Sequence, residues 1–395
     1  MKILIADKLS DNAVKALENM GASVRLEPDA AAGDLPQLMN DAEILIVRST
    51  KVNKAAMDAA SSLSLIIRAG AGVNTIDLEY ASALGIHVAN CPGKNADAVA
   101  ELTIGHMIAL DRNIVDNSID LRNGVWNKKG YSKARGLKGR TLGILGLGSI
   151  GTKVAAVAQV MGMNVQAWSR SLTEQKAKTM GLGFCPTPMD LARSSDIVSI
   201  HLAASNDTRH LVDRSFLEAM KESAFLINTS RGEIVDSAAL MEICSSKSLK
   251  IALDVYEDEP GASEKTFPHT ELAQLITGTH HIGASTQQAA DAIADEVVKI
   301  VESYRSSGKP LHPVNARDKS TAQFNLVVRH FNKVGVLAAV LDALRNADIN
   351  IEEMENSIFS GGEAAVCTLK LDDRPSDVIL NEISSMDNII KASLK

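Results

Sequence analysis

The sequence predicts an α/β protein with two doubly wound parallel-sheet domains, Rossmann or flavodoxin-like, and a C-terminal ferredoxin-like βαββαβ domain. Two observations support this prediction. Short apolar runs alternate with amphipathic stretches over residues 2–285, which is typical of parallel strands joined by helices. Beyond a polar linker, the order changes to strand, helix, two strands, helix and strand.

The first sheet is expected within residues 1–95. The runs KILIA, ASVRL, EILIV, LSLIIR and IHVAN are short and apolar, so they are predicted to be buried strands. The stretches between them, SDNAVKALENMG, NKAAMDAAS and TIDLEYASALG, have capping-type starts or glycine stops and are predicted to be helices. A long helix expected over 286–307 is predicted to pack back on this sheet, so that 1–95 and 286–315 form one domain.

The second sheet is expected within residues 96–285, with the strands TLGILG, NVQAW, DIVSI, AFLINTS, KIALDV and LITGTHHIG. Residues 308–321 are polar and contain two prolines, which indicates a linker. The third domain is then expected over 322–395, with a Gly-Gly turn between its second and third strands.

Composition favours a cytoplasmic protein of several domains. The chain has 395 residues, 45% of them hydrophobic and 23% charged, which is typical of globular proteins. A net charge of −7 offers no basic footprint for nucleic acid. Four scattered cysteines suggest neither a disulfide framework nor a zinc site. The start MKILIADKLS is too short for a signal peptide, and no apolar run is long enough for a membrane span.

A glycine-rich turn, GLGSIG, follows the strand TLGIL and opens a helical stretch. Gly146 permits the tight turn, Gly148 lets the backbone approach a pyrophosphate, and Gly151 allows the helix to pack closely on the strand. The free N–H groups at the start of the helix then bind the anion. GxGxxG alone is a weak signal, but this strand–turn–helix context predicts a dinucleotide site.

The next strand should end, about 20 residues on, with an acidic residue for the ribose of NAD. Here it ends QAWSRS, which places Ser169 and Arg170 at that point. A carboxylate would repel the 2′-phosphate of NADP, whereas a hydroxyl beside a guanidinium can bind it. NAD is the expected cofactor, with NADP tolerated or preferred if Arg170 binds phosphate; a solvated Arg170 is the other interpretation.

Three further motifs follow predicted strands: NTSRG, LDVYEDEP and THHIGAS. Together with GLGSIG, they resemble the D-isomer-specific 2-hydroxyacid dehydrogenase family over about residues 1–315. The resemblance implies that Arg231, Glu259 and His281 form the catalytic set. It also implies cofactor contacts from Ser149, Ile150, Leu202, Thr229, Ser230, Asp254 and Gly283.

The chemistry of a 2-hydroxy acid suits these residue types. Loss of hydride to a nicotinamide must be accompanied by loss of the hydroxyl proton, and histidine is a suitable base near neutral pH. Glu259 would orient and tune His281, while Arg231 would hold the carboxylate and polarise the carbonyl. Taken singly, each is as easily a surface ion pair, a solvated loop residue or a satisfied histidine.

The first domain carries VRST, RAGAGVN and CPGKNADAVAEL, which resemble the phosphoglycerate dehydrogenase branch of that family. The resemblance implies oxidation of 3-phospho-D-glycerate to 3-phosphohydroxypyruvate, the first step of L-serine biosynthesis. The implied substrate-binding residues are Arg48, Ser49, Arg68, Gly72 and Asn95. The segment NGVWNKKG, with Trp126, Lys128 and Lys129, could add positive charge nearby or form a subunit contact.

The C-terminal sequence resembles the ACT domain, a small regulatory ligand-binding module, over 324–395. His330, Asn332, Gly335 and Asn350 match the pattern that contacts L-serine between two such domains, although Val334 replaces the usual proline. The resemblance implies feedback by serine and a homo-oligomer, dimer or tetramer. Asn332 could instead only cap the turn.

Two alternatives remain open: an NADPH-dependent glyoxylate/hydroxypyruvate reductase and an NAD-sensing co-regulator. The paired histidines of THHIGA raise a third question. On an extended segment, His280 and His281 would point to opposite faces, so a metal site is not predicted and only His281 is expected to face the nicotinamide.

Overall fold

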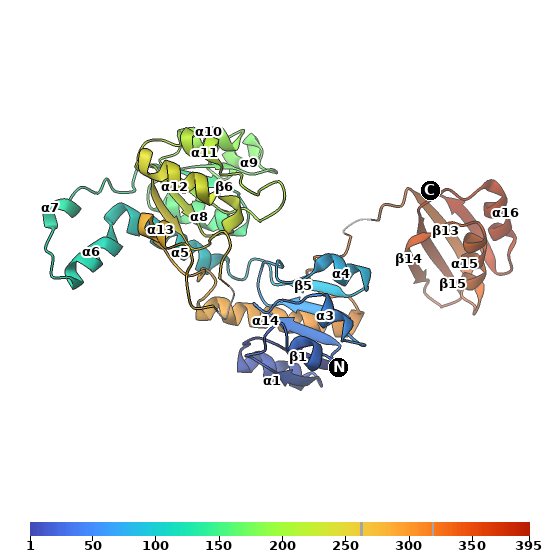
Figure 1. The fold of residues 1–395 in the computed structure, drawn as a ribbon. Coiled ribbons are helices and arrows are strands. Elements are labelled where there is room, and N and C mark those ends of the chain that lie inside the picture. The colour runs from blue at the N-terminus through green and yellow to red at the C-terminus, as the bar shows by residue number, and fades with distance from the viewer. Residues whose placement is uncertain (261–263, 318–319) are drawn as a thin grey trace. The chain divides into compact units, whose positions relative to one another are not determined.

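The computed structural model describes residues 1–260, 264–317 and 320–395 and divides into two compact units, 1–315 and 316–395. Figure 1 shows both units as ribbons. Within the larger unit, two parallel sheets form what we call the first and second lobes. In the three described stretches, no helix is long and apolar enough to cross a membrane.

The first lobe contains a five-stranded sheet of order β2-β1-β3-β4-β5, with every pair parallel. This is the flavodoxin-like order, and all five predicted strands are confirmed. The strands are β1 (Lys2–Ile5), β2 (Ser23–Leu26), β3 (Ile44–Val47), β4 (Leu65–Arg68) and β5 (His87–Asn90). The helices between them are α1 (Asp11–Asn19), α2 (Leu35–Leu38), α3 (Lys54–Asp58) and α4 (Leu78–Ala83).

The long helix α14 (Gln287–Ser307) covers one face of this sheet, as Figure 1 shows. Its buried face, including Ile293, Val297 and Ile300, packs against Ile3 and Ile67 in one apolar cluster. The chain therefore returns to the first lobe after it has completed the second. The segment beyond α14 stays with this lobe, since Pro313 forms a bridge with Ala89 of β5.

The second lobe contains a seven-stranded parallel sheet of order β12-β11-β10-β9-β6-β7-β8. Read from β8, this is the Rossmann order 3-2-1-4-5-6 with one added strand. The strands are β6 (Thr141–Leu145), β7 (Asn164–Trp168), β8 (Gly183–Phe184), β9 (Ile197–Ile200), β10 (Phe225–Asn228), β11 (Lys250–Leu253) and β12 (Ile276–Gly278). The two-residue β8 was not predicted, because so short an edge strand has no periodicity of its own.

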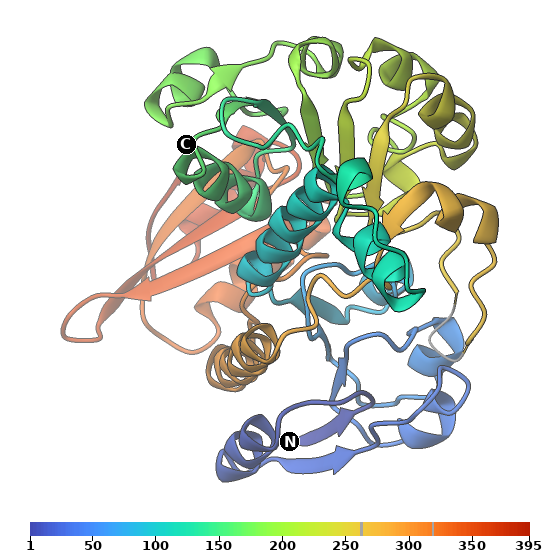
Figure 2. The ribbon, with the colours of Figure 1, turned by 90° about the vertical axis from the view of Figure 1, so that its left-hand side faces the viewer.

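Helices cover both faces of the second sheet. Figure 2 shows α5 crossing one face, where its Ala100, Met107 and Leu110 pack with Leu142 and Ile144. The helices are α5 (Ala96–Arg112), α6 (Ile114–Arg122), α7 (Lys128–Tyr131), α8 (Ser149–Val160), α9 (Glu174–Thr179), α10 (Pro188–Ser194), α11 (Arg214–Ala219), α12 (Ser237–Ser246), α13 (Thr270–Leu275) and the short 3-10 helix η1 (Gly232–Ile234).

The strand predicted over LITGTHHIG is shorter than expected. β12 ends at Gly278, and His281 has a left-handed backbone with φ 51°. The cause is the Asp254 carboxylate, which accepts hydrogen bonds from the amides of Ile282 and Gly283 at 2.8 Å each. These bonds draw the chain into a turn, so the prediction of an extended segment at the two histidines is wrong.

The smaller unit is an antiparallel four-stranded sheet of order β14-β15-β13-β16, which confirms the ferredoxin-like prediction. Its strands are β13 (Phe324–Phe331), β14 (Ile351–Ile358), β15 (Ala364–Leu371) and β16 (Ile389–Leu394), and its helices are α15 (Val336–Asn346) and α16 (Asp377–Ser385). The core combines alternate residues of the inner strands, such as Val328 and Leu369, with Val340, Leu344 and Ile383 of the helices.

Candidate active site

His281 and Glu259 form a close pair in the second lobe. The Nδ1 atom of His281 lies 2.6 Å from Oε2 of Glu259, and Oε1 of Glu259 accepts the amide of Tyr256 at 3.0 Å. Burial alone would raise the pKa of Glu259. The hydrogen bond and charge of His281, the amide of Tyr256 and the charge of Arg231 outweigh burial and hold that pKa below its ordinary value. Glu259 is therefore an ionised acceptor that leaves Nε2 of His281 free for a substrate.

A series of buried hydrogen bonds stabilises the His281 turn. Asp254, only 1% exposed at the end of β11, also accepts the Thr279 hydroxyl at 2.7 Å. That hydroxyl in turn lies 3.0 Å from Nε2 of His106 on α5. Because the Thr279 hydroxyl donates to Asp254, Nε2 of His106 is the donor in this contact, and burial lowers the pKa of the ring. The predicted cofactor residue Asp254 thus has a defined task in this structure, which is to fix the His281 turn.

Arg231 follows β10, and Asn228 at the end of that strand shapes its turn. The side chain of Asn228 donates to the carbonyl of Arg231 at 2.8 Å and accepts the amide and hydroxyl of Ser230. One guanidinium nitrogen of Arg231 donates back to the Ser230 carbonyl at 2.6 Å. A second guanidinium nitrogen of Arg231 would lie 2.2 Å from a Cβ at Gly72. A glycine is therefore required at this position of the first lobe to make room for the arginine from the second lobe.

Three arginines gather between the lobes: Arg48 at the end of β3, Arg68 at the end of β4, and Arg231. Burial, followed by the charges of Arg231 and Arg48, lowers the pKa of Arg68 to about 10. Its Nε is buried and has no hydrogen-bond partner among the residues the structure describes. Gly70 makes room for this guanidinium, because a Cβ there would lie 1.7 Å from it. Such a cluster is poised for an anionic ligand.

The other predicted substrate residues lie around this cluster in the first lobe. The Asp7 carboxylate accepts the amides of Arg48 and Ser49 and the hydroxyl of Ser49, at 2.7, 3.1 and 2.9 Å. Asn95 occupies the N-cap of α5, in the segment that joins the lobes. Asp7, which the sequence did not single out, thus organises the loop that presents Arg48.

The GLGSIG turn has the geometry that a dinucleotide requires. Gly146 has φ 101°, and a Cβ on it would lie 2.6 Å from the His201 carbonyl oxygen. A Cβ at Gly151 would lie 2.2 Å from the carbonyl oxygen of Gly146, whereas Gly148 faces open space. Ser149 and Ile150 form the first turn of α8, so their amides point from the helix start, which favours a pyrophosphate.

A pocket of about 320 Å³ lies beside this turn and suits the adenosine half of the cofactor. Leu147, Ser169 and Lys176 are among its lining residues. The Arg170 side chain is 80% exposed, with one nitrogen 3.9 Å from Asp207. An arginine this exposed can turn toward a 2′-phosphate or stay in solvent, so both interpretations of Ser169 and Arg170 fit the geometry.

The remaining predicted cofactor residues lie along the same edge of the second sheet. Leu202, after β9, would meet a Cβ placed on Gly146 at 2.8 Å. The hydroxyl of Thr229 is 2.8 Å from that of Thr103 on α5. A Cβ at Gly283 would lie 3.0 Å from Asp254 and 3.3 Å from Val99, so this glycine permits a close approach to α5.

A pocket of about 490 Å³ lies against the pair formed by His281 and Glu259. Its lining includes Tyr256, Phe267 and Glu259 together with both His280 and His281. The sequence predicted that the two histidines face opposite ways, but the turn brings both to the same pocket. The burial of Tyr256, with the charges of Asp254 and Glu259, raises its pKa to about 12.

The structure separates the predicted effector residues of the smaller unit. His330 is 2% exposed, and its ring bonds the Phe331 carbonyl and Asn356 at 2.8 and 3.2 Å. Asn332 is exposed and donates to the Gly362 carbonyl at 2.9 Å, at the turn between β14 and β15. Asn350 is exposed at the other end of that hairpin, where its amide donates to Asp372.

Comparison with known proteins agrees with this geometry. Residues 104–305 match the model of the D-isomer specific 2-hydroxyacid dehydrogenase NAD binding domain. The chain is 30% identical to a D-3-phosphoglycerate dehydrogenase of Dictyostelium discoideum, covering 99% of this chain and 96% of that one. It is 34% identical to a hydroxypyruvate reductase of Thermotoga maritima, covering 75% of this chain and 96% of that protein.

The match to some relatives is partial. A D-3-phosphoglycerate dehydrogenase of Methanocaldococcus jannaschii is 36% identical over 76% of this chain, but the match spans only 57% of that protein. Among solved structures, the NAD+-bound 3-phosphoglycerate dehydrogenase of Entamoeba histolytica superposes with a TM-score of 0.67 and 27% identity, covering 80% of this chain and 99% of that one.

Proposed function

We propose, on the premise that this chain belongs to the D-isomer-specific 2-hydroxyacid dehydrogenase family, that it oxidises 3-phospho-D-glycerate to 3-phosphohydroxypyruvate with NAD. The observation that carries the proposal is the cluster of Arg48, Arg68 and Arg231 next to the His281–Glu259 pair. A 2-hydroxy acid with one carboxylate needs one guanidinium to hold it. A cluster of three fits a substrate that carries a phosphate as well.

The chain's own residues account for the proton transfer. Nε2 of His281 accepts the substrate hydroxyl proton while Glu259, at Nδ1, stabilises the resulting imidazolium. Arg231 binds the carboxylate beside the reacting carbon. Its positive charge also stabilises the carbonyl oxygen that develops as the hydroxyl is oxidised. The nicotinamide dinucleotide, held at GLGSIG, supplies the hydride acceptor.

Arg48 and Arg68 would bind the phosphate from the first lobe. The unpartnered Nε of Arg68 supports this role, since a buried guanidinium donor gains most from an anionic acceptor. The test is an assay of the purified chain with NAD, following the nicotinamide absorbance, with 3-phosphoglycerate compared with D-glycerate. The proposal requires 3-phosphoglycerate to be the better substrate by kcat/KM, and equal rates would refute the phosphate role.

A glyoxylate/hydroxypyruvate reductase that uses NADPH is the second candidate. It is favoured by the cationic end of the adenosine pocket, where Lys176 lines the wall and Arg170 is exposed. The same assay, run in reverse with hydroxypyruvate and each reduced cofactor, separates the two. A preference for NADPH together with unphosphorylated substrate would favour this candidate.

We also propose that L-serine binds between two copies of the smaller unit. Asn332 and Asn350 lie at opposite ends of the β14–β15 hairpin, roughly 27 Å apart for eight residues per strand. One serine cannot reach both within one unit, whereas two units paired side by side in opposite orientations would bring Asn332 of one copy next to Asn350 of the other. Serine should therefore lower activity in wild type, and Asn350→Ala should abolish this inhibition while leaving basal turnover intact.

Pairing of the larger unit is supported by the arm formed by α6 and α7, which extends from the second lobe in Figure 1. No residue of α6 is buried, and Ile119, Leu121 and Trp126 are 47%, 57% and 79% exposed. An apolar arm of this kind fits a homo-oligomer, which light scattering would detect. The four cysteines are buried free thiols, which supports a reducing, cytoplasmic setting.

A further inference from the structure

A cationic pocket of about 420 Å³ opens at the amino ends of β6, β9, β10 and β11. Because these strands are parallel, their amino ends lie at the sheet edge opposite Arg231 and His281, roughly 15 Å away along strands of this length. Five cationic side chains and three carboxylates are in its lining. They are Lys133, Arg135, Arg140, Lys221 and Lys250, with Asp111, Asp196 and Glu222.

Arg140 is the central member of this pocket. It is 4% exposed, its guanidinium carbon stacks 4.0 Å from the centre of the Phe225 ring, and burial lowers its pKa. Its bonds to Asp111 and to the Asp196 carbonyl are long, at 3.4 and 3.3 Å. Its Nε is buried with no partner in the three described stretches of chain. The guanidinium is thus only partly satisfied by the protein.

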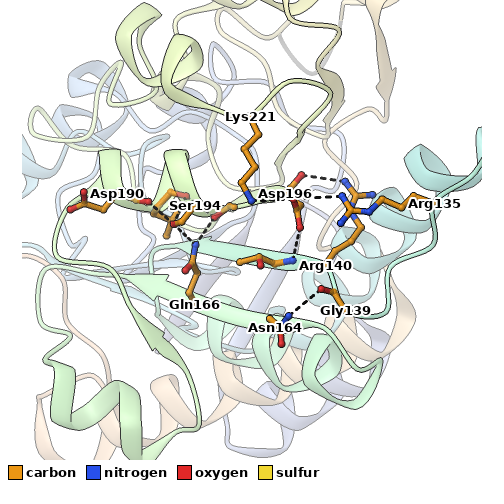
Figure 3. A network of polar contacts seen from close by, with 12 residues as sticks. Arg135, Gly139, Arg140, Asn164, Gln166, Asp190, Ser194, Asp196 and Lys221 are labelled. Carbon is orange, nitrogen blue, oxygen red and sulfur yellow. Dashed lines mark hydrogen bonds and ion pairs between the residues drawn. The ribbon is translucent and has the colours of Figure 1, made fainter.

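Asp111 and Asp196, two of the three carboxylates, are already engaged by protein donors. Asp196 accepts the amide of Thr141 at 2.9 Å, and its other oxygen lies 3.1 Å from Lys221 and 3.6 Å from Arg135. Figure 3 shows the Lys221 and Arg135 side chains converging on Asp196. Lys250 donates to neutral oxygens, the Leu110 carbonyl and the Asn113 side chain. Positive charge therefore remains in excess inside the pocket.

We propose that this pocket binds a phosphate group, from inorganic phosphate or from a small phosphorylated metabolite. A tetrahedral dianion can accept several donors at once, so it would pair with the guanidinium of Arg140, which lines the pocket, while facing the exposed Lys133 and Arg135. The volume leaves room for more than the phosphate alone. The site is distinct from the cleft between the lobes, because it lies on the other edge of the sheet.

The test is calorimetric titration of the full chain with inorganic phosphate at constant ionic strength, with chloride as the balancing anion. Saturating NAD is present so that the GLGSIG turn is occupied. Five proteins are compared: wild type, Lys133→Ala/Arg135→Ala, Arg140→Lys, the cleft variant Arg48→Ala, and Lys178→Ala as an exposed control on α9. The double variant changes only exposed residues, so it keeps the test decisive if Arg140→Lys fails to fold.

The proposal predicts a phosphate-binding event that survives in Arg48→Ala and Lys178→Ala. It should weaken about tenfold or more in both pocket variants, as expected for a lost charge-assisted hydrogen bond. A parallel titration with glycerol 3-phosphate identifies the source of the phosphate: tighter binding than inorganic phosphate indicates a metabolite, and weaker binding indicates the free ion. Binding that disappears in Arg48→Ala, or that is unchanged in the double variant, would overturn the proposal.

Discussion

Replacing Glu259 with glutamine tests the role of the carboxylate in the proposed catalytic pair. The amide keeps the shape of the side chain, and its oxygen can still accept the Tyr256 amide, so the loop should stay in place. Its NH2 group would then face Nδ1 of His281, which must become an acceptor and leave the proton on Nε2. The substrate hydroxyl would meet a donor where the reaction needs a base.

The size of the effect follows from the contact. A charge-assisted hydrogen bond contributes about 1.5–3 kcal/mol. The lower half of this range applies here because solvent screens the contact: the side chains of His281 and Glu259 are 48% and 30% exposed. About 1.5–2 kcal/mol less stabilisation of the imidazolium lowers kcat/KM about 10- to 30-fold.

The assay is the initial rate of NAD reduction across a pH series, with Glu271→Gln, an exposed glutamate on α13, as the matched control. We expect a loss of kcat with KM for NAD unchanged. Activity of Glu259→Gln within threefold of wild type at every pH would refute it.

Three further predictions concern the same lobe. His281→Asn should lower kcat about 100-fold or more with NADH binding retained, whereas His280→Asn should stay within a few fold; similar losses in both would contradict the assignment. Gly232→Ala should destabilise the protein by about 1–3 kcal/mol in urea unfolding, because its Cβ would lie 1.9 Å from the Tyr256 carbonyl oxygen, whereas Gly33→Ala, which meets nothing within 4 Å, should be neutral. Burial lowers the pKa of His201 to about 3. Between pH 6.5 and pH 3, the unfolded chain therefore binds a proton at this histidine and the folded chain does not. The free energy of unfolding should fall by about 1.4 kcal/mol per pH unit toward pH 3, and a His201→Gln variant that showed the same slope would rule this group out.

The sequence predicted the three sheets well because most of their strands are short apolar runs bounded by turn residues, although β14, IEEMENSI, is largely polar and exposed. It also placed Arg231, Glu259 and His281 correctly at one sheet edge, since all three follow parallel strands. The turn at His281 could not be predicted, because it depends on Asp254, which is 27 residues earlier in the chain and meets the turn only in the folded sheet. Sequence periodicity indicates local burial and cannot predict a hydrogen bond between residues that are far apart in the sequence.

Some of the residues that support the site could have been found from the sequence, and others could not. Asn228 ends the apolar run AFLIN, and a polar residue at a strand end was a usable signal. Asp7 holds a comparable place after β1. The link from His106 to Thr279 was not visible, because a histidine inside a helix gives no sign of a partner 173 residues away. The Arg140 pocket was likewise hidden, as its members come from six separate segments.

We propose above that three arginines select a phosphorylated 2-hydroxy acid for the His281–Glu259 pair. The most direct measurement is the ratio of kcat/KM for 3-phosphoglycerate to that for D-glycerate, in wild type and in Arg48→Met. We expect a ratio well above one in wild type that falls about tenfold or more in the variant, with the rate on D-glycerate little changed. A ratio that is the same in both proteins would contradict it.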